Sequence, residues 1–404
     1  MQIGLLGKAN VGKSTFFSAA TEVAVQSGNF PFTTIEPNVG VAYVETRCAC
    51  AHFGIEHQND LCRNGTRLVP VRLIDVAGLV PGAHEGKGLG NKFLDNARQA
   101  EILIHVVDAA GTTDIQGQPV AAGTHDPAED VRFVRDEFDL WFADILMRDW
   151  DRIIREVEQK RAKLADGIAE RFSGLGITAP DVHRVLAGMG LEGRGPAEWS
   201  ESDTVSFARR LRADAKPMII AANKADLCGG SIPDVAAALA GASDGARVVP
   251  CSAETELLLR KAAKAGIITY APGAGSFEVA PGAGEKLAPQ QTKALDMAAA
   301  ILSRMSDTGV QRLLDAAVFE ILGYIVVYPV EDETRLTNKD GQVLPDSRLV
   351  PSGSTVRDLA ASVHADLAEG LLHAIDCKTK QRISGDKQLS DGDVIKIVST
   401  MSRG

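Results

Sequence analysis

The segment GKANVGKS, Gly7–Ser14, carries the clearest chemical signal and follows the apolar run MQIGLL. It matches G-x-x-x-x-G-K-[ST], a pattern whose glycines let backbone N–H groups turn toward phosphate oxygens at a helix N-terminus. In this pattern Lys13 reaches the β- and γ-phosphates, and the Ser14 hydroxyl takes one position around Mg²⁺. The alternative is a glycine turn with a Lys-Ser pair by chance, which leaves the strand-like and helix-like flanks unexplained. We expect a phosphate loop whose nucleotide contacts are Gly7, Asn10, Val11, Gly12, Lys13, Ser14 and Thr15.

A second candidate is the tetrapeptide Asp75-Val76-Ala77-Gly78, at the end of the apolar segment LVPVRLID. A carboxylate at a strand end can hold Mg²⁺ directly or through water, and the Gly78 N–H can bond a γ-phosphate and sense its loss. The pattern D-x-x-G is weak by itself, and a turn after a strand is the alternative. The phosphate loop upstream makes the functional interpretation specific.

A threonine between these two motifs could complete the metal site. The stretch PFTTIEPN contains Thr34, which we expect to close over Mg²⁺ when a γ-phosphate is present. The alternative is a pair of β-branched residues in an ordinary strand or loop. The predicted Mg²⁺ ligands are thus Ser14, Thr34 and Asp75, with Lys13, Thr34 and Gly78 among the catalytic residues.

The motif that would select the base is Asn223-Lys224-Ala225-Asp226, directly after the apolar run KPMIIAA. The Asp226 carboxylate can accept two hydrogen bonds from the N1–H and amino group of guanine, which adenine does not offer in that arrangement. Asn223 would brace the loop, and the aliphatic stem of Lys224 would cover the base. Ser252-Ala253 ends the next strand, where a backbone N–H can bond guanine O6. Four such elements in this order are together specific for a guanine nucleotide.

Strands alternating with helices must position these motifs. Strands are predicted at residues 1–7, 39–46, 68–75, 100–109, 216–222 and 246–252, and the run AEILIHVVDA has the continuous apolarity of a strand buried on both faces. The predicted fold class is α/β, a mostly parallel sheet with helices on both faces, and each motif lies at the carboxyl end of a strand.

A long helical stretch interrupts this pattern. It starts at Asp126-Pro127, with acidic residues in the first turn, and exceeds the usual length of one globular helix, so we expect two helices packed as a hairpin or coiled coil. Shorter helices are expected at 179–187 and 204–213. The segment 270–289 repeats APGAG and has the composition of a linker, and a helical segment follows from about 290 to 322. The last stretch is a small mixed domain with a helix at 355–367 capped by Ser354 and a turn at Asp391-Gly392-Asp393.

The composition limits the remaining possibilities. The 404 residues are 45% hydrophobic, 24% charged and of net charge −10, which permits two or three domains and argues against a broad basic surface for DNA. No run is apolar and long enough for a membrane span, and the start does not have the pattern of a secretory signal. These features predict a cytoplasmic protein whose six cysteines are reduced.

Taken together, GKANVGKST, FPFTTIEPNVG, DVAGLVPGAHEGKGLGNKFL and NKAD resemble the Obg-related GTPases of the translation-factor class, in particular the archaeal-type YchF and Drg branch. The insertion beginning HDPAEDV resembles the helical arm of YchF proteins, and the segment from LPDSRLVPSGSTVRDL to DGDVIKIVS resembles a TGS domain, a β-grasp module. The resemblance implies a GTPase domain at 1–126 and 215–270, an inserted arm at 127–214, a linker and helical segment at 271–324, and a TGS domain at 325–400.

The same resemblance addresses the residue after D-x-x-G. Leu79 stands where many GTPases carry a glutamine that orients the attacking water. Related GTPases with an apolar residue there use K⁺ near the phosphates, held partly by a phosphate-loop asparagine, and Asn10 occupies that position. Asn10 with K⁺ is therefore the predicted catalytic replacement. The alternative is that Asn10 only hydrogen-bonds within its loop.

A cysteine-rich stretch, CACAHFGIEHQNDLC, lies outside these motifs. Cys48, Cys50 and Cys62 with a histidine could make a tetrahedral Zn²⁺ site. The spacing lacks paired C-x-x-C motifs, so reduced cysteines in a loop are the favoured interpretation, and a metal site is the alternative.

The sequence thus predicts a GTP-hydrolysing switch that uses Mg²⁺, and in one hypothesis K⁺, and that binds GTP or GDP and a ribosome or another rRNA- or tRNA-containing complex. Bacterial and eukaryotic YchF proteins prefer ATP and have an altered base motif, whereas NKAD is intact here. The alternatives are an ATP-preferring YchF-type ATPase, a nucleotide-dependent scaffold that does not hydrolyse, and a metabolic P-loop kinase.

Overall fold

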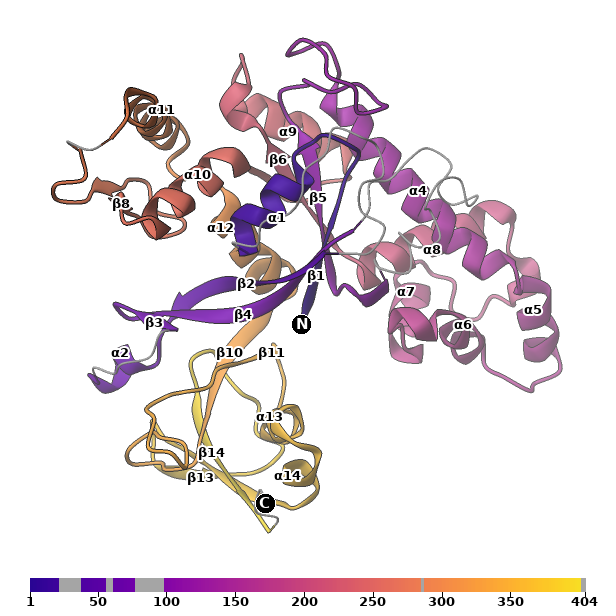
Figure 1. The fold of residues 1–404 in the computed structure, drawn as a ribbon. Helices are drawn as coiled ribbons and strands as arrows, with labels where there is room; N and C mark the ends of the chain where they lie inside the picture. Colours follow the sequence, from indigo (N-terminus) through magenta and orange to yellow (C-terminus); the bar gives the residue numbers. More distant parts are fainter. Residues whose placement is uncertain (22–37, 56–60, 77–97, 285–286, 401–404) are drawn as a thin grey trace. The chain divides into compact units, whose positions relative to one another are not determined.

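The computed structural model describes residues 1–21, 38–55, 61–76, 98–284 and 287–400 (Figure 1). The chain divides into two compact units. The first contains Met1–Val41 and Arg72–Leu313, and the second contains Ala42–Val71 and Leu314–Gly404, so the division cuts strands β2 and β4. No helix within the described ranges is long and apolar enough to cross a membrane.

The main sheet has the strand order β2-β4-β1-β5-β6-β7, with the short β3 paired to β4, and the first unit contains β1, β5, β6, β7 and one end each of β2 and β4. Pairing is parallel from β4 through β1, β5 and β6 to β7, as the alternation of strands and helices predicts. Every residue of β5 is buried, which confirms a strand covered on both faces. The strands of this sheet are β1 (Gln2–Leu6), β2 (Asn38–Arg47), β3 (Cys62–Arg63), β4 (Thr66–Asp75), β5 (Ile102–Asp108), β6 (Met218–Asn223) and β7 (Val248–Pro250).

Helices cover this sheet and follow its strands. Helix α1 (Lys13–Thr21) follows β1 and packs against α10 (Ala253–Lys264), which follows β7. Helix α9 (Ile232–Ala242) packs against β7 and against α4 (Pro127–Met147). Parallel strands need such crossover helices, and the connections leave the carboxyl ends of β1, β4, β5, β6 and β7 at one edge of the sheet.

The long polar stretch between β5 and β6 forms more helices than expected. It contains α4, α5 (Trp150–Glu158) and α6 (Leu164–Phe172), followed by α7 (Ala179–Gly188) and α8 (Glu201–Ala215). The expected start is confirmed, because Asp126 caps α4 and accepts a hydrogen bond from the Ala128 N–H. The expected pair of helices was wrong. The chain breaks after Met147 and again near Lys160, whose φ of 54° ends the helical path.

These five helices share one core with the main sheet instead of forming a coiled coil, and that core includes Leu6 of β1, Ile74 of β4 and Leu103 of β5. Phe142 stacks on Phe172 with ring centroids 5.3 Å apart, and Trp199 contacts Phe207 at 5.2 Å. Asp139 of α4 is buried, and each of its oxygens accepts a hydrogen bond from an arginine of α8, Arg209 at 2.9 Å and Arg212 at 2.8 Å. The aromatic contacts and the buried, paired charge of Asp139 hold α4 and α8 in one arrangement, which a long amphipathic contact by itself would specify less closely.

The first unit ends with a segment that packs beside α10. Strands β8 (Ile268–Thr269) and β9 (Glu278–Val279) form a short antiparallel pair, and α11 (Pro289–Met305) and α12 (Val310–Asp315) follow. Ile268 and Leu302 share a core with Leu259 of α10. The Gly/Pro-rich stretch therefore contains ordered structure, because its few apolar residues are buried against helices. Short 3₁₀ turns lie elsewhere at Ser173–Leu175, Pro196–Glu198 and Ala225–Leu227.

The second unit contains a separate sheet of order β11-β10-β14-β12-β13. Strands β10 and β14 are parallel, and the other neighbours are antiparallel. Helix α13 begins after Thr355, not Ser354 as expected, because Thr355 and Asp358 form a capping box. The turn at residues 391–393 is confirmed, with Asp391 accepting from the Val326 N–H. The elements are α2 (Cys50–Phe53), β10 (Tyr324–Val330), β11 (Arg348–Pro351), α13 (Val356–Val363), α14 (Ala365–Glu369), β12 (Leu371–Asp376), β13 (Gln381–Ile383) and β14 (Val394–Ser399), with a π-helical turn at Ala316–Ile321.

Candidate functional site

The glycine-rich loop connects β1 to α1 at the carboxyl edge of the main sheet. Gly12 has a φ of 91°, and a Cβ there would lie 2.3 Å from Asn223 Nδ2, so no other residue fits without displacing the neighbouring loop. The Phe16 N–H donates to Gly12 O at 2.8 Å and starts the helix. Gly7 and Val11 are buried, and Thr15 is half-buried in the first turn of α1. The loop therefore presents a helix N-terminus, which favours anionic groups.

Lys13 and Ser14 meet the carboxylate at the end of β4. Asp75 is fully buried, and Lys13 Nζ lies 2.7 Å from its Oδ1. The Ser14 hydroxyl donates to Asp75 Oδ2 at 3.3 Å. The parallel register of β1 and β4 pairs Leu5 with Asp75, which places the two motifs side by side although they are far apart in sequence. A hydroxyl and a carboxylate this close are hard oxygen donors of the kind that Mg²⁺ prefers.

Asn223 joins the phosphate loop to the neighbouring strand end. Its side-chain N–H donates to Val11 O at 2.9 Å, and its Oδ1 accepts from the Ala253 N–H at 3.1 Å. The side chain is almost completely buried between these partners. One amide therefore ties together loops that follow β1, β6 and β7.

Lys224 makes a second connection in the same place. It has a φ of 59°, and its Nζ donates to Asn10 O at 3.0 Å and to Asp108 Oδ2 at 2.8 Å. Asp108 ends β5 and also accepts hydrogen bonds from Thr112 and Thr113. Burial alone would raise the pKa of Asp108, but the hydrogen bonds from Lys224 and both threonines outweigh it and keep the pKa below the usual value. Asp108 thus stays charged and holds the lysine along the loops.

Asp226 is held through its backbone. Its carbonyl oxygen accepts from an Arg304 guanidinium N–H at 2.6 Å, and the carboxylate makes no side-chain hydrogen bond within the described part of the chain. Arg304 comes from α11, so a segment near the end of the first unit supports the loop after β6. The half-buried carboxylate is therefore positioned and still able to accept hydrogen bonds from a ligand.

The amides of Ser252 and Ala253 are already bonded within the protein. The Ser252 N–H donates to Thr308 O at 2.8 Å, and the Ala253 N–H donates to Asn223 Oδ1. A contact between either amide and a base would therefore share or replace one of these bonds. Both residues are fully buried.

Two further contacts surround the phosphate loop. Asn10 has a φ of 62°, and its side-chain N–H donates to Gly117 O at 2.9 Å, outside its own loop. Lys8 is buried, and its Nζ lies 2.7 Å from Asp130 Oδ2 and bonds Thr113 O at 3.0 Å. Asp130 lies in the first turn of α4, so this ion pair attaches the helical insertion directly to the phosphate loop.

The structure brings most of the expected residues together and also adds some. Lys8, Asp108, Asp130, Arg304 and Thr308 were not predicted, although a carboxylate ending β5 in HVVDA is a signal that could have identified Asp108. Arg304 and Thr308 belong to no motif and could not be found from spacing. Thr34, Gly78 and Leu79 lie outside the described residues.

Three family models match the chain, and they agree with this architecture. Residues 2–131 match the 50S ribosome-binding GTPase family, residues 221–332 match the G4 motif-containing domain of YGR210-like Obg-like GTPases, and residues 334–399 match the TGS domain. The main sheet is that of a P-loop GTPase fold with an inserted set of helices, and the separate sheet of the second unit belongs to the TGS domain.

Individual relatives agree with the family models. An uncharacterized GTP-binding protein of Methanocaldococcus jannaschii is 45% identical over 402 residues, 98% of each chain. The ribosome-binding ATPase YchF of Escherichia coli is 37% identical over 164 residues, 40% of this chain and 41% of that protein.

Two solved structures have the same fold over almost the whole length. A GTP-binding protein of Pyrococcus horikoshii has a TM-score of 0.77 at 40% identity and covers 99% of this chain and 100% of its own. The YchF GTPase of Schizosaccharomyces pombe has a TM-score of 0.53 at 15% identity, with 98% of this chain and 97% of its own covered, and shows the fold alone. The chain therefore belongs to the YchF-related branch of the Obg-like GTP-binding proteins, which carry a C-terminal TGS domain.

Proposed function

We propose that this protein hydrolyses GTP to GDP and phosphate and acts as a nucleotide-dependent switch on ribosomes or another RNA-containing translation complex. The observation that carries this proposal is the loop Asn223–Asp226. It is hydrogen-bonded to the phosphate loop through Asn223 and Lys224, and Arg304 donates a hydrogen bond to its Asp226 carbonyl oxygen. A base bound beside the phosphate loop would therefore meet the Asp226 carboxylate, which has no partner of its own within the described residues.

The carboxylate favours guanine over adenine. Guanine offers two adjacent donors, N1–H and the amino group, whereas adenine would leave the carboxylate unpaired and partly desolvated. A site built to receive donors discriminates strongly against a ligand that lacks them. The YchF relatives of Haemophilus ducreyi and Escherichia coli are named ATPases, and the match to each covers less than half of either chain, so ATP preference is the competing hypothesis.

The metal site would consist of Ser14 and Asp75, together with Thr34 of the undescribed segment. The 3.3 Å between the Ser14 hydroxyl and Asp75 Oδ2 supports the first two as neighbouring Mg²⁺ ligands, bound directly or through water. Bound Mg²⁺ would neutralise charge on the β- and γ-phosphates. Lys13 can leave Asp75 for the phosphates at that point, because the metal then supplies the charge that Asp75 needs. Gly78 would contact the γ-phosphate and report its loss.

Hydrolysis without a glutamine at position 79 needs another source of charge. Asn10 donates its side-chain N–H to Gly117 O, and its side-chain carbonyl oxygen accepts no hydrogen bond within the described residues. An oxygen beside the phosphate loop suits K⁺, and a cation there would stabilise charge developing between the phosphates. In this proposal Asn10 and K⁺ replace the glutamine.

The nucleotide state would reach a partner through the helical insertion. The buried Lys8–Asp130 pair connects the phosphate loop to the first turn of α4, so a change in the loop alters the position of a helix that extends away from the site. The ribosome is the proposed partner because the YchF relatives are named ribosome-binding proteins, and such a partner would place the chain in the cytoplasm.

Nucleotide choice is tested by titrating the purified full-length chain with fluorescent GTP and ATP analogues in Mg²⁺ buffer. We expect GTP to bind about 10²-fold more tightly or better. Equal affinity, or tighter binding of ATP, would favour the ATPase hypothesis. Inorganic phosphate release in matched KCl and NaCl then tests the catalytic part, and equal rates would remove K⁺ from it.

The switch is tested by co-sedimentation with ribosomes in the presence of a non-hydrolysable GTP analogue, GDP or no nucleotide. We expect the analogue to give the most binding and ribosomes to stimulate single-turnover hydrolysis. Nucleotide-dependent sedimentation with no phosphate release would support the scaffold instead. Transfer of the γ-phosphate to a small metabolite would support a kinase.

A further inference from the structure

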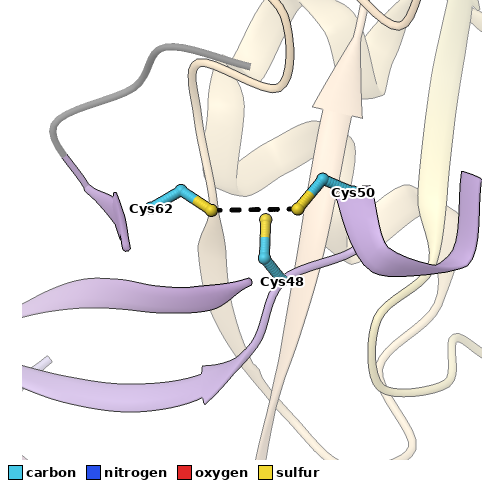
Figure 2. Close-up of side chains that lie close together, drawn as sticks. All are labelled: Cys48, Cys50 and Cys62. Carbon is cyan, nitrogen blue, oxygen red and sulfur yellow. Dashed lines mark hydrogen bonds between the residues drawn. The ribbon is translucent and has the colours of Figure 1, made fainter. Parts of the chain in front are cut away.

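Three cysteine side chains converge in the second unit, and none of them belongs to the motifs that define the nucleotide site. Figure 2 shows the sulfurs of Cys48, Cys50 and Cys62 pointing toward one another. All three sulfurs lie within 4.8 Å of one another, and Cys50 Sγ is 3.8 Å from Cys62 Sγ. Zinc–sulfur bonds are about 2.3 Å long, so two sulfurs on a zinc tetrahedron are about 3.8 Å apart. The spacing is therefore that of metal ligands.

The fold holds the sulfurs in place through its backbone. Cys48 and Cys50 flank the turn between β2 and α2, while Cys62 lies in β3, just before a hairpin turn at Asn64-Gly65. These turn residues have φ of 49° and 82°, as a tight two-residue hairpin requires. The Cys48 N–H donates to Gly65 O at 2.7 Å, which joins the two cysteine-bearing segments.

The surroundings of the sulfurs make a bare cluster unfavourable as thiolates. Cys48 is 1% exposed and Cys50 is 6% exposed. A bound divalent cation would supply the missing positive charge and displace the protons.

Other uses of these residues explain less. A disulfide would pair only two of the three sulfurs and leave a buried thiol beside it. Simple packing does not require three sulfurs at mutual ligand distance, and sulfur is a weak hydrogen-bond donor and acceptor. The sequence lacks paired C-x-x-C motifs, and for that reason it favoured reduced cysteines over a metal site. In the structure, the β3–β4 hairpin brings Cys62 beside Cys48 and Cys50, as a second motif would do.

We propose that Cys48, Cys50 and Cys62 bind one Zn²⁺ as thiolates and supply three of its four ligands. The group includes no fourth His, Cys, Asp or Glu from the described residues. The metal would cross-link β2 to the β3–β4 hairpin. Helix α2 has 4 residues and β3 has 2, so neither is stable by itself, and a metal bond supplies the free energy that so few residues cannot.

The test begins with the metal content of the full-length chain, purified without chelators from zinc-supplemented cells. Elemental analysis should find about one Zn²⁺ per chain. Cys50→Ser and Cys62→Ser should each lose most of it, whereas Cys228→Ser, a half-buried cysteine outside the cluster, should retain it. Wild-type protein without zinc, or zinc retained in all three variants, would overturn the proposal.

A second measurement covers variants that fold poorly. Chelator treatment of wild-type protein should release the metal, expose the three thiols to a thiol reagent, and be reversed by added Zn²⁺. Co²⁺ added instead should give the near-ultraviolet sulfur-to-cobalt absorption and the intense visible bands of a tetrahedral thiolate site. Absence of the sulfur-to-cobalt absorption, or a disulfide among these cysteines in non-reducing peptide mapping, would contradict the assignment.

Discussion

The nucleotide site and the cysteine cluster are assembled in different ways. Each motif of the nucleotide site ends a parallel strand, so the order of strands in one sheet collects residues as distant as Lys13 and Asn223 at one edge. The cysteine cluster depends on one hairpin and on hydrogen bonds between two short segments. A sequence displays the first arrangement as separate motifs, whereas the second becomes visible only when the turn is known.

The two sites also differ in how they compensate buried charge. In the nucleotide site Lys13, Lys8 and Lys224 each face a buried carboxylate, so the chain carries both signs of charge. In the cluster the three sulfurs are chemically alike, and in our proposal a Zn²⁺ ion supplies the positive charge. The first site can therefore be disturbed by removing one member of a pair, and the second by removing a metal.

The largest effect is expected at Lys13. Lys13→Met should slow GTP hydrolysis by about 10²–10³-fold, because it removes a charge from the phosphates, and should destabilise the protein by about 3–5 kcal/mol, because Asp75 is left buried without a partner. Single-turnover phosphate release and denaturant unfolding measure the two losses. The double variant Lys13→Met/Asp75→Asn should regain stability and not hydrolysis. Recovery of both would show that Lys13 acts only through folding.

The next effect concerns the base. Asp226→Asn replaces an acceptor-only carboxylate by an amide, and should reduce GTP affinity by about 10²-fold while ATP affinity changes little. Titration with fluorescent analogues measures both affinities. Asp234→Asn, on the exposed first turn of α9, is the matched control and should leave them unchanged. An equal loss for GTP and ATP would mean that Asp226 only supports the loop.

Most of the fold was predictable because its signals are local. The buried apolar run of β5, the glycines of the phosphate loop and the proline-led start of α4 each depend on neighbouring residues. The break near Lys160 was not predictable, since a charged helical pattern continues across it and only a positive φ ends the helix. The cap of α13 moved from Ser354 to Thr355 because the reciprocal bond with Asp358 decides between adjacent hydroxyls.

The candidate site was predictable where a sequence motif carries the chemistry. It was not predictable where residues distant in sequence hold the motif loops in place. Asn223, Lys224 and Asp226 are recognisable from their order after a strand. Arg304, which holds Asp226, and Thr308, which holds Ser252, come from the segment at about 290 to 322 that was predicted only as helical. Hydrogen bonds to a backbone carbonyl or amide need no particular motif, so spacing cannot reveal them.

Loss of the hydrogen bonds from Arg304 should have a moderate effect on GTP affinity. Arg304→Ala removes the guanidinium that bonds Asp226 O and Ala225 O, and should weaken GTP binding by about tenfold, equivalent to about 1.4 kcal/mol. Hydrolysis of bound GTP in single turnover should be nearly unchanged, because the phosphate contacts remain. Arg304→Lys should restore part of the affinity. A loss of turnover with normal affinity would contradict a supporting role for Arg304.

The last effect is of similar size and is produced by acid. His105 lies in β5 and is buried, and burial, aided by the nearby Lys8 charge, lowers its pKa to about 3 from 6.5. The unfolded state therefore binds a proton below pH 6.5 that the folded state does not, so stability is complete above 6.5 and falls as the pH drops toward 3. The loss due to this histidine should reach about 1.4 kcal/mol one pH unit below its ordinary value.

This loss is measured by denaturant unfolding at pH 7.5 and at a pH about one unit below the ordinary histidine pKa. Tryptophan fluorescence reports the first unit, because Trp141, Trp150 and Trp199 all lie there. His105→Leu should remove that part of the pH dependence, whereas His373→Leu, in β12 of the second unit, should leave it. The same acid shift in wild type and His105→Leu would assign it to other groups. The second unit has no tryptophan, so the fluorescence signal comes from the first unit alone. A difference between the two variants would therefore assign the acid-dependent loss of stability to the unit that contains the candidate nucleotide site.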